Sequence, residues 1–155
     1  MRPARDSDGP AVAAVMTAVY AFYPGCLYEE AEYPEHRALA SHYEARAGAA
    51  WVAELDGRLV GSLAIERTRD PQVFELHKVY LLPEARGTGA ARQMLEAALD
   101  LARAAGGRRV RLWSDTRFRE GHAFYDRNGF ARIGAVRFLD DVSRSWEFAY
   151  VRELA

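Results

Sequence analysis

The sequence contains almost no cysteine and almost no lysine. Cys26 is the single cysteine in 155 residues, which excludes an internal disulfide and any cysteine-based metal cluster, and we expect no metal site. Lys78 is the only lysine among the 21 basic residues, a bias that we attribute to GC-rich coding rather than to function. The net charge is -1, so there is no basic surplus for general nucleic-acid binding.

Long hydrophobic runs are absent as well. Residues 1–6 carry no apolar signal region, and no apolar stretch approaches the length of a membrane span. We therefore expect a cytoplasmic protein that does not associate with membranes. Hydrophobic residues make up 50% of the chain and charged residues 28%, as in ordinary globular proteins, and we expect one domain over residues 1–155.

Hydrophobic spacing and turn residues give an alternating order of elements. The expected order is strand, two helices, three strands, helix, strand, helix and two strands. The expected strands are 2–4, 50–55, 58–66, 75–82, 109–113, 130–138 and 145–151, and Asp56-Gly57 forms the turn of the first hairpin. The first expected helix ends near residue 20. The others span 35–47, a segment opened by residues 86–91 and running to about 105, and 119–127. This order predicts a mixed α/β sandwich around one sheet.

The chain is organised around residues 75–91. The period of two places four residues on one face of a strand: Glu75, His77, Val79 and Leu81. Pro83 ends this strand, and the small residues that follow open a helix. Free N–H groups and a partial positive charge at the first turn of a helix make a natural phosphate site, to which Arg86 and Arg92 add charge.

Residues 86–92 can be compared with three types of glycine-rich loop. A P-loop requires a lysine after the last glycine, and none follows Gly89. A dinucleotide fingerprint requires glycine or alanine where Arg92 stands. The pattern Arg86-x-x-Gly89-x-Ala91, preceded by Val79-x-Leu81-x-Pro83, resembles the acyl-CoA pyrophosphate loop of the GNAT N-acetyltransferase superfamily.

A second motif supports the same resemblance. Residues 122–130, His-Ala-Phe-Tyr-Asp-Arg-Asn-Gly-Phe, are similar to the superfamily signature Phe-Tyr-x-x-x-Gly-Phe. The resemblance covers essentially the whole chain. It implies a single mixed, mostly antiparallel, splayed sheet of about six to seven strands flanked by four helices. It also implies an N-acetyltransferase that uses acetyl-CoA and transfers the acetyl group directly to a primary amine in a ternary complex.

The resemblance also implies which residues contact acetyl-CoA. Main-chain groups at Val79, Tyr80 and Leu81 would pair with the pantetheine arm like an added strand, and the Leu81 amide would stabilise the oxyanion. The expected diphosphate and cofactor contacts are Arg86, Gly87, Thr88, Gly89, Ala90, Ala91, Arg92, Asp115 and Tyr125. Many relatives have asparagine seven residues before the motif tyrosine, where this chain has Phe118. A hydrogen bond to the pantetheine arm is therefore either missing or supplied by Ser114, Asp115 or Thr116.

Three residues are candidates for acid–base catalysis. By resemblance, Tyr125 would protonate the leaving thiolate, although a packed tyrosine with its hydroxyl bonded to the backbone is the alternative. Glu75 is the expected base, and His77 on the same face is the second choice, with water as a third. Salt-bridged or solvated strand residues are the competing interpretation for both. If Val79 and Leu81 flank the cofactor, Glu75 should face the same cleft.

The acceptor site is the least defined part of the sequence. Tyr23, Tyr28 and Tyr33 lie near Glu29, Glu30 and Glu32 and would suit a cation with an apolar body, whereas a solvated acidic turn is the simpler alternative. The expected acceptor is a small-molecule or peptide amine, and a homodimer is possible. The competing functions are a non-catalytic acyl-CoA-binding module and a protein N-terminal or lysine acetyltransferase.

Overall fold

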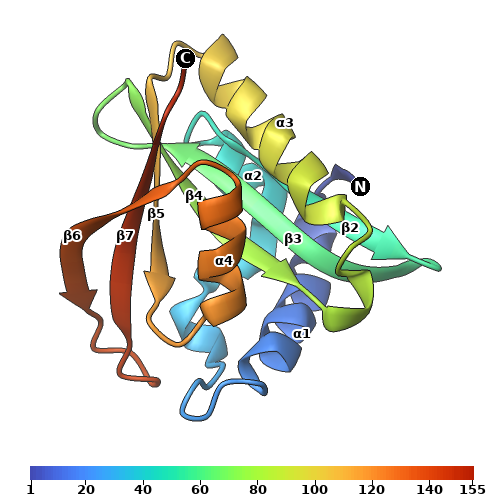
Figure 1. Cartoon of the computed structure of the whole chain (residues 1–155). Coiled ribbons are helices and arrows are strands. Elements are labelled where there is room, and N and C mark those ends of the chain that lie inside the picture. Colours follow the sequence, from blue (N-terminus) through green and yellow to red (C-terminus); the bar gives the residue numbers. More distant parts are fainter.

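Seven strands pair into one open sheet in the computed structural model, which describes residues 1–155 (Figure 1). In chain order they are β1 (Arg2–Pro3), β2 (Ala49–Leu55), β3 (Arg58–Arg67), β4 (Val73–Leu81), β5 (Arg109–Asp115), β6 (Ala131–Phe138) and β7 (Trp146–Glu153). Their order across the sheet is β1-β2-β3-β4-β5-β7-β6, and only the β4–β5 pair is parallel. The predicted mixed, mostly antiparallel sheet is confirmed.

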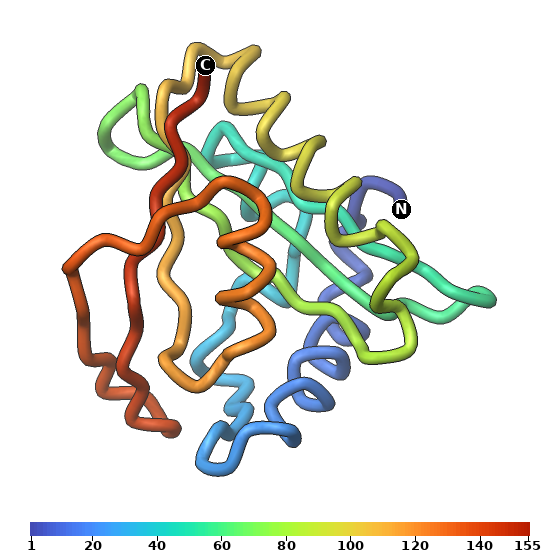
Figure 2. The backbone as a smooth tube through the Cα atoms, viewed as in Figure 1, coloured from blue at the N-terminus to red at the C-terminus, as the bar shows by residue number.

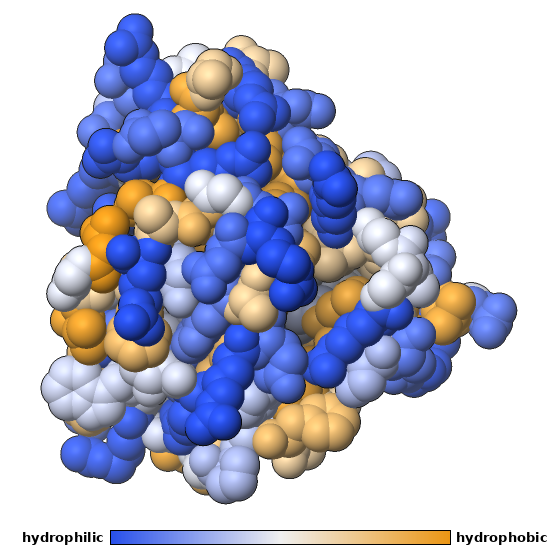
Figure 3. Space-filling model, in the orientation of Figure 1, coloured by the Kyte–Doolittle hydropathy of each residue, from blue (hydrophilic) through white to orange (hydrophobic).

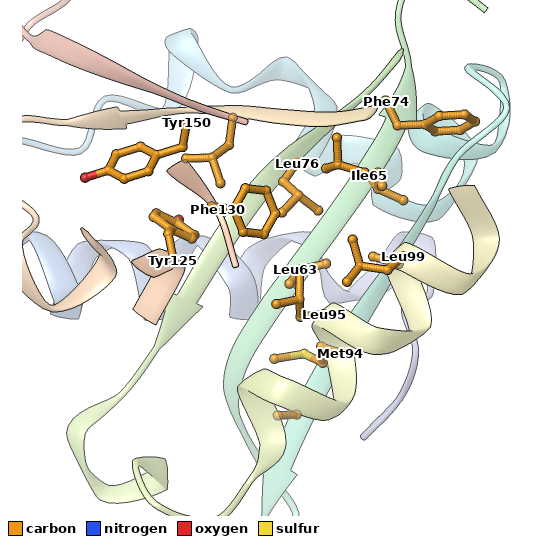
Figure 4. Packing of buried hydrophobic residues seen from close by; sticks show 14 of the residues in the cluster. Leu63, Ile65, Phe74, Leu76, Met94, Leu95, Leu99, Tyr125, Phe130 and Tyr150 are labelled. Atoms are coloured by element: carbon orange, nitrogen blue, oxygen red, sulfur yellow. The ribbon is translucent and has the colours of Figure 1, made fainter. Parts of the chain in front are cut away.

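Four α-helices cover the two faces of the sheet, as predicted. They are α1 (Gly9–Tyr20), α2 (Leu39–Glu44), α3 (Ala90–Ala104) and α4 (Arg119–Arg127). An apolar stripe of α3 is buried against β3, where Met94, Leu95 and Leu99 approach Leu63 and Ile65 (Figure 4). A second hydrophobic cluster lies between the other face and helices α1 and α2. No helix is long and apolar enough to cross a membrane.

Strands β4 and β5 pair at one end and then diverge. Parallel pairing joins Val73–Glu75 to Arg109–Arg111 and stops there. Beyond this point, α4 lies in front of the widening gap, as the cartoon and the backbone tube both show (Figures 1 and 2). The sheet is therefore splayed at its centre, and the splay leaves the second half of β4 without a backbone partner on its β5 side.

A β-bulge interrupts β4 at Lys78 and corrects one prediction. Lys78 has φ +55. Between the pairs His77–Ala64 and Tyr80–Ser62, β4 has two residues where β3 has one. As a result, His77 and Lys78 both project towards α1 and α2, and from Val79 onward the two faces are exchanged. Glu75 and His77 therefore do not share a face with Val79 and Leu81, because the period of two holds only within an uninterrupted ladder.

The expected helix over residues 35–47 is shorter and divided. A 3₁₀ segment at Pro34–Ala38 precedes α2, because Ala38 has non-helical angles, φ −151 and ψ 68. The predicted hairpin turn is confirmed, since Asp56 and Gly57 both adopt positive φ angles, 51 and 75.

Candidate functional site

Two cavities meet where β4 and β5 diverge. One, which we call the groove, runs between β4, the loop after Pro83 and α4, and has a volume of about 520 Å³. The other, which we call the pocket, lies on the α1 side of the sheet and has a volume of about 200 Å³. They share one wall, made of Val79, Tyr80, Ser114, Phe118 and Tyr125. A ligand in the groove can therefore meet a ligand in the pocket at this wall.

The loop before α3 presents several backbone N–H groups to the groove. Gly87 and Gly89 have φ angles of 77 and 83, a conformation that glycine adopts without strain. Four N–H groups of this segment have no hydrogen-bond acceptor within the protein, those of Gly87, Gly89, Ala91 and Arg92. Together with the positive end of the α3 dipole, they form a concave site that suits a diphosphate.

Arginine side chains add positive charge to this end of the groove. Arg86 and Arg92 line the groove as the sequence predicted, and Arg127 from α4 joins them. A role for Arg127 in the groove could not be predicted, because no local spacing links the last turn of α4 to the glycine loop. Thr88 does not line the groove; its hydroxyl donates to the Ala85 carbonyl at 2.7 Å and thereby shapes the loop.

The diverging half of β4 forms a second side of the groove. Val79, Tyr80 and Leu81 line it, and no backbone pairing with β5 occupies their open edge. The opposite edge is held by β3, where the Ser62 hydroxyl donates to the Lys78 carbonyl at 2.7 Å. An extended ligand can therefore pair with the free edge as the resemblance implies.

Tyr125 lies at the shared wall with its ring packed and its hydroxyl free. The residue is 5% exposed, and its ring contacts those of Phe124, Phe130 and Tyr150 (Figure 4). The hydroxyl makes no hydrogen bond to the backbone, so the structural alternative considered for this residue is not observed. Burial, assisted by Tyr150 and by the charge of Glu147, raises the pKa of Tyr125, which keeps its proton at neutral pH.

Phe118 supplies packing where relatives carry asparagine. Its ring centroid lies 4.9 Å from that of Tyr23 and 5.7 Å from that of Tyr20, at the junction of the two cavities. Among the proposed substitutes for the asparagine, Ser114 lines both cavities. Asp115 lines the pocket and not the groove, and its carboxylate is held by Arg117 at 2.8 and 2.9 Å.

Glu75 and His77 line the pocket rather than the groove. Glu75 Oε2 accepts a hydrogen bond from Arg111 Nε at 2.5 Å. His77 Nε2 lies 3.3 Å from Glu66 Oε1 and 3.4 Å from Glu75 Oε1. The structure therefore places both predicted bases on the acceptor side of the sheet, within a salt-bridged group, and their catalytic roles stay predictions.

The three tyrosines expected at the acceptor site take different positions. Tyr33 lines the pocket, and its hydroxyl lies 2.9 Å from that of Tyr20, which in turn lies 3.0 Å from that of Tyr80. Tyr28 lines neither cavity and stacks behind Tyr33, with ring centroids 5.3 Å apart. Tyr23 lines the groove and bonds to Glu120. Only Tyr33 therefore lies where an acceptor in the pocket would touch it.

The C-terminal hairpin contributes three charged pocket residues, of which two were not predicted and the third, Asp141, was weighed for the pocket with a turn role preferred. Arg137 on β6 and Glu147 on β7 face one another in register and line the pocket. Asp141, in the connecting loop, lines it too. Alternation along β7 indicates which residues share a face with Glu147. It does not indicate that this face and β4 line the same pocket.

Most of the chain matches a known family. A family profile described as "Acetyltransferase (GNAT) family" matches residues 14–130. The chain is 33% identical over 138 residues to "Uncharacterized N-acetyltransferase YjgM" of Escherichia coli, covering 86% of this chain and 82% of that protein. It is 34% identical over 134 residues to an uncharacterized N-acetyltransferase of Mycobacterium tuberculosis, with 78% and 84% covered.

Solved structures share the fold over nearly the full length. An acetyltransferase of the GNAT family from Staphylococcus aureus superposes with a TM-score of 0.83 at 16% identity, covering 99% of this chain and 97% of that one. An acetyltransferase from Streptococcus agalactiae gives 0.80 at 23% identity, with 96% and 92% covered. At these identities the likeness concerns the fold alone.

Proposed function

The chain belongs to the GNAT family of acetyltransferases, and from this membership we propose that it is an N-acetyltransferase that uses acetyl-CoA and acetylates a small primary amine. The observation that carries the proposal is the continuous path from the glycine loop to Tyr125. Four acceptor-free amides stand at one end of the groove, and a free tyrosine hydroxyl stands at the other. Such a path suits an acyl-CoA molecule whose thioester reaches the shared wall.

Each end of acetyl-CoA has a matching part of the groove. The N–H groups at Gly87, Gly89 and Ala91 are suited to bind the diphosphate, with Arg86 and Arg92 neutralising its charge. The free edge of β4 is suited to pair with the amide groups of the pantetheine arm. The Leu81 amide remains our candidate for stabilising the oxyanion.

The reaction needs no covalent enzyme intermediate. The amine nitrogen attacks the thioester carbonyl carbon, the C–N bond forms, and the C–S bond breaks as the tetrahedral intermediate collapses. Tyr125 donates its proton to the departing thiolate, and a proton from the acceptor nitrogen replaces it. Because burial raises the pKa of Tyr125, its hydroxyl carries the proton at neutral pH and the proton is present when the thiolate departs.

The size of the pocket favours a small molecule over a protein as acceptor. Its volume is about 200 Å³, and aromatic side chains and carboxylates enclose it. A pocket of this size suits one compact amine.

The proposal is tested by measuring binding and turnover separately. Calorimetry should detect acetyl-CoA binding, and a thiol-release assay with a panel of amines should detect transfer. Binding without transfer to any amine would favour the non-catalytic acyl-CoA-binding module. The absence of binding would remove the proposed function altogether.

A further inference from the structure

Four carboxylates line the pocket: Glu75, Asp115, Asp141 and Glu147. Both oxygens of the two aspartates accept hydrogen bonds within the protein, whereas only one oxygen of Glu75 does. In Glu75, Oε2 accepts from Arg111 Nε at 2.5 Å and Oε1 lies 3.4 Å from His77 Nε2. These contacts fix the Glu75 carboxylate at the paired end of β4 and β5.

The two aspartates are hydrogen-bonded through both carboxylate oxygens. Both oxygens of Asp115 accept hydrogen bonds from Arg117, at 2.8 and 2.9 Å. Both oxygens of Asp141 accept from Ser145, through its N–H and its hydroxyl, each at 2.8 Å. Each oxygen of the two aspartates therefore already has a donor from the protein.

Glu147, like Glu75, has one oxygen without a hydrogen-bond donor in the protein, but Glu147 lies beside the shared wall. Its Oε1 accepts from Arg137 Nε at 2.7 Å, whereas Oε2 has no hydrogen-bond donor in the protein, although the side chain is only 14% exposed. Oε2 is not among the buried polar atoms that lack a partner, so this oxygen reaches open space, and Glu147 lines the pocket. An unsatisfied carboxylate oxygen at the wall of a cavity is suited to accept a donor from a ligand.

Glu147 also lies close to the reacting end of the groove. It is opposite Asp115 in the β5–β7 register, one residue from Ser114 of the shared wall. Its charge contributes to the raised pKa of both Tyr80 and Tyr125, although burial is the largest cause in each case. The carboxylate is therefore electrostatically coupled to two residues of the shared wall.

We propose, building on the proposed acetyl transfer, that Glu147 binds the ammonium group of the acceptor through Oε2 and accepts its proton, and that the acceptor is a small cationic amine without a carboxylate. Glu147 acts here on the reacting nitrogen itself, and Arg137 positions it by holding Oε1. Glu75, the base expected from the sequence, then serves to hold Arg111 and His77 in place.

The exclusion of a carboxylate follows from the cations of the pocket. Lys78 and Arg137 are the lysine and arginine of its lining, and both are already paired, with Glu35 and Glu147 respectively. His77, the remaining basic residue, lies between the carboxylates of Glu66 and Glu75. No unpaired lysine or arginine is left to bind an acceptor carboxylate, which would also face three further lining carboxylates.

The proton balance is complete with these groups. Glu147 takes the first proton from the ammonium and releases it to solvent after the reaction. The neutral amine then attacks the thioester, the C–N bond forms and the C–S bond breaks. The thiolate takes the Tyr125 proton, and the second proton of the former ammonium returns to Tyr125. The products are an N-acetyl amine, free CoA thiol and one proton.

The pH dependence of the rate tests the role of Glu147. Burial raises the pKa of this carboxyl, Arg137 opposes the rise, and Asp115 and Asp141 add to it. Because Glu147 must be ionised to accept a proton, kcat/KM should fall as pH drops through this pKa. Glu147→Gln should lower kcat/KM about 100-fold at neutral pH and remove that acidic limb.

A matched control removes a similar ion pair elsewhere on β7. Glu153 pairs with Arg109 at 2.6 Å and lies outside both cavities, so Glu153→Gln should leave the rate and its pH profile unchanged. The acetyl-CoA affinity of Glu147→Gln should stay within twofold of the wild type, which shows that the variant is folded. Glu147→Asp should keep the acidic limb at a lower rate. A full rate for Glu147→Gln, or loss of the limb in Glu75→Gln instead, would overturn the inference.

Pairs of acceptors that differ only by a carboxylate test the substrate class. Phenethylamine, tyramine and agmatine should each be acetylated with a kcat/KM at least 10-fold above phenylalanine, tyrosine and arginine. Equal or better rates with the amino acids would overturn the substrate class while leaving the proposed acetyl transfer intact. A lack of acetyl-CoA binding in the same preparation would instead remove the proposed function, and the inference with it.

Discussion

At the scale of single residues, Tyr125 combines a fixed ring with a free hydroxyl. Aromatic contacts with Phe130 and Tyr150 hold the ring, and the residue borders both cavities. Tyr20, by contrast, is committed to hydrogen bonds with the hydroxyls of Tyr33 and Tyr80. A proton on Tyr125 can therefore be given to a ligand without breaking a bond within the protein.

Removing this hydroxyl should slow the reaction without disturbing the fold. Tyr125→Phe should lower kcat about 100-fold, because the thiolate would then leave unprotonated, while acetyl-CoA affinity should change by less than about twofold. Steady-state kinetics and calorimetry measure the two quantities. Tyr43→Phe is the control, since Tyr43 is buried but lines neither cavity, and it should keep full activity. Unchanged turnover in Tyr125→Phe would remove the acid role.

At the scale of elements, sequence periodicity predicted nearly every strand and helix but failed inside β4. Lys78 occupies a positive φ that glycine usually takes, so no residue type marked the bulge. The extra residue exchanges the faces of β4, and this exchange separates Glu75 from Val79. A local pattern cannot reveal a bulge whose cause is the pairing with β3 on one side and a missing pairing with β5 on the other.

The glycine loop was predictable because its signal is local. Residues 86–91 carry the small side chains, the positive φ positions and the helix start within one stretch. The pocket was not predictable in the same way, since Tyr33, Glu75 and Glu147 come from three distant parts of the chain. Their proximity depends on the strand order, in which β7 lies beside β5, and no spacing in the sequence encodes it.

A negative charge at the start of α3 should prevent binding of acetyl-CoA. Ala91→Glu would place a carboxylate at an amide-lined site meant for phosphate groups, and we expect at least a 100-fold loss of affinity by calorimetry. Gln93→Glu adds the same charge to the same helix at an exposed position outside the groove, and it should lose less than about threefold. Similar affinities for the two variants would contradict the diphosphate site.

At the scale of the whole molecule, the sheet has one unprotected edge. All residues of β6 are exposed, including Ile133, Val136 and Phe138, and β6 pairs only with β7. In the space-filling view, hydrophilic residues cover most of the surface, and hydrophobic residues form several separate patches, one of them on the side where Figure 1 places β6 (Figure 3). The homodimer expected from the sequence stays a prediction.

Global stability should depend on the ionisation of a buried histidine. His36 is 6% exposed, its Nδ1 lies 3.0 Å from the Tyr28 hydroxyl, and burial lowers its pKa to about 4. The unfolded chain gains this proton near pH 6.5, whereas the folded chain does not. The contribution of His36 to the free energy of unfolding is therefore fully present above pH 6.5 and is lost progressively as the pH falls from 6.5 to about 4. The lowered pKa values of His42 and His122 act in the same direction.

Urea denaturation at pH 7.5 and pH 5 measures this effect. The free energy of unfolding should fall by about 2 kcal/mol from His36 alone, and His36→Phe, which keeps the stacking on Tyr33, should lose most of that pH dependence. An equal fall in His36→Phe and in the wild type would show that other groups cause it.

The position of Lys78, the only lysine, has a consequence for assays of acetyl transfer. Lys78 has an 8% exposed side chain, closed off by Glu35 and the Tyr33 ring. Apart from its α-amino group, the protein thus offers no accessible amine to its own acetyl donor. Slow thiol release in a mixture without added acceptor would therefore measure hydrolysis of the thioester together with acetylation of the α-amino group at most, and amine-reactive dyes would report added acceptors against a low background from the protein.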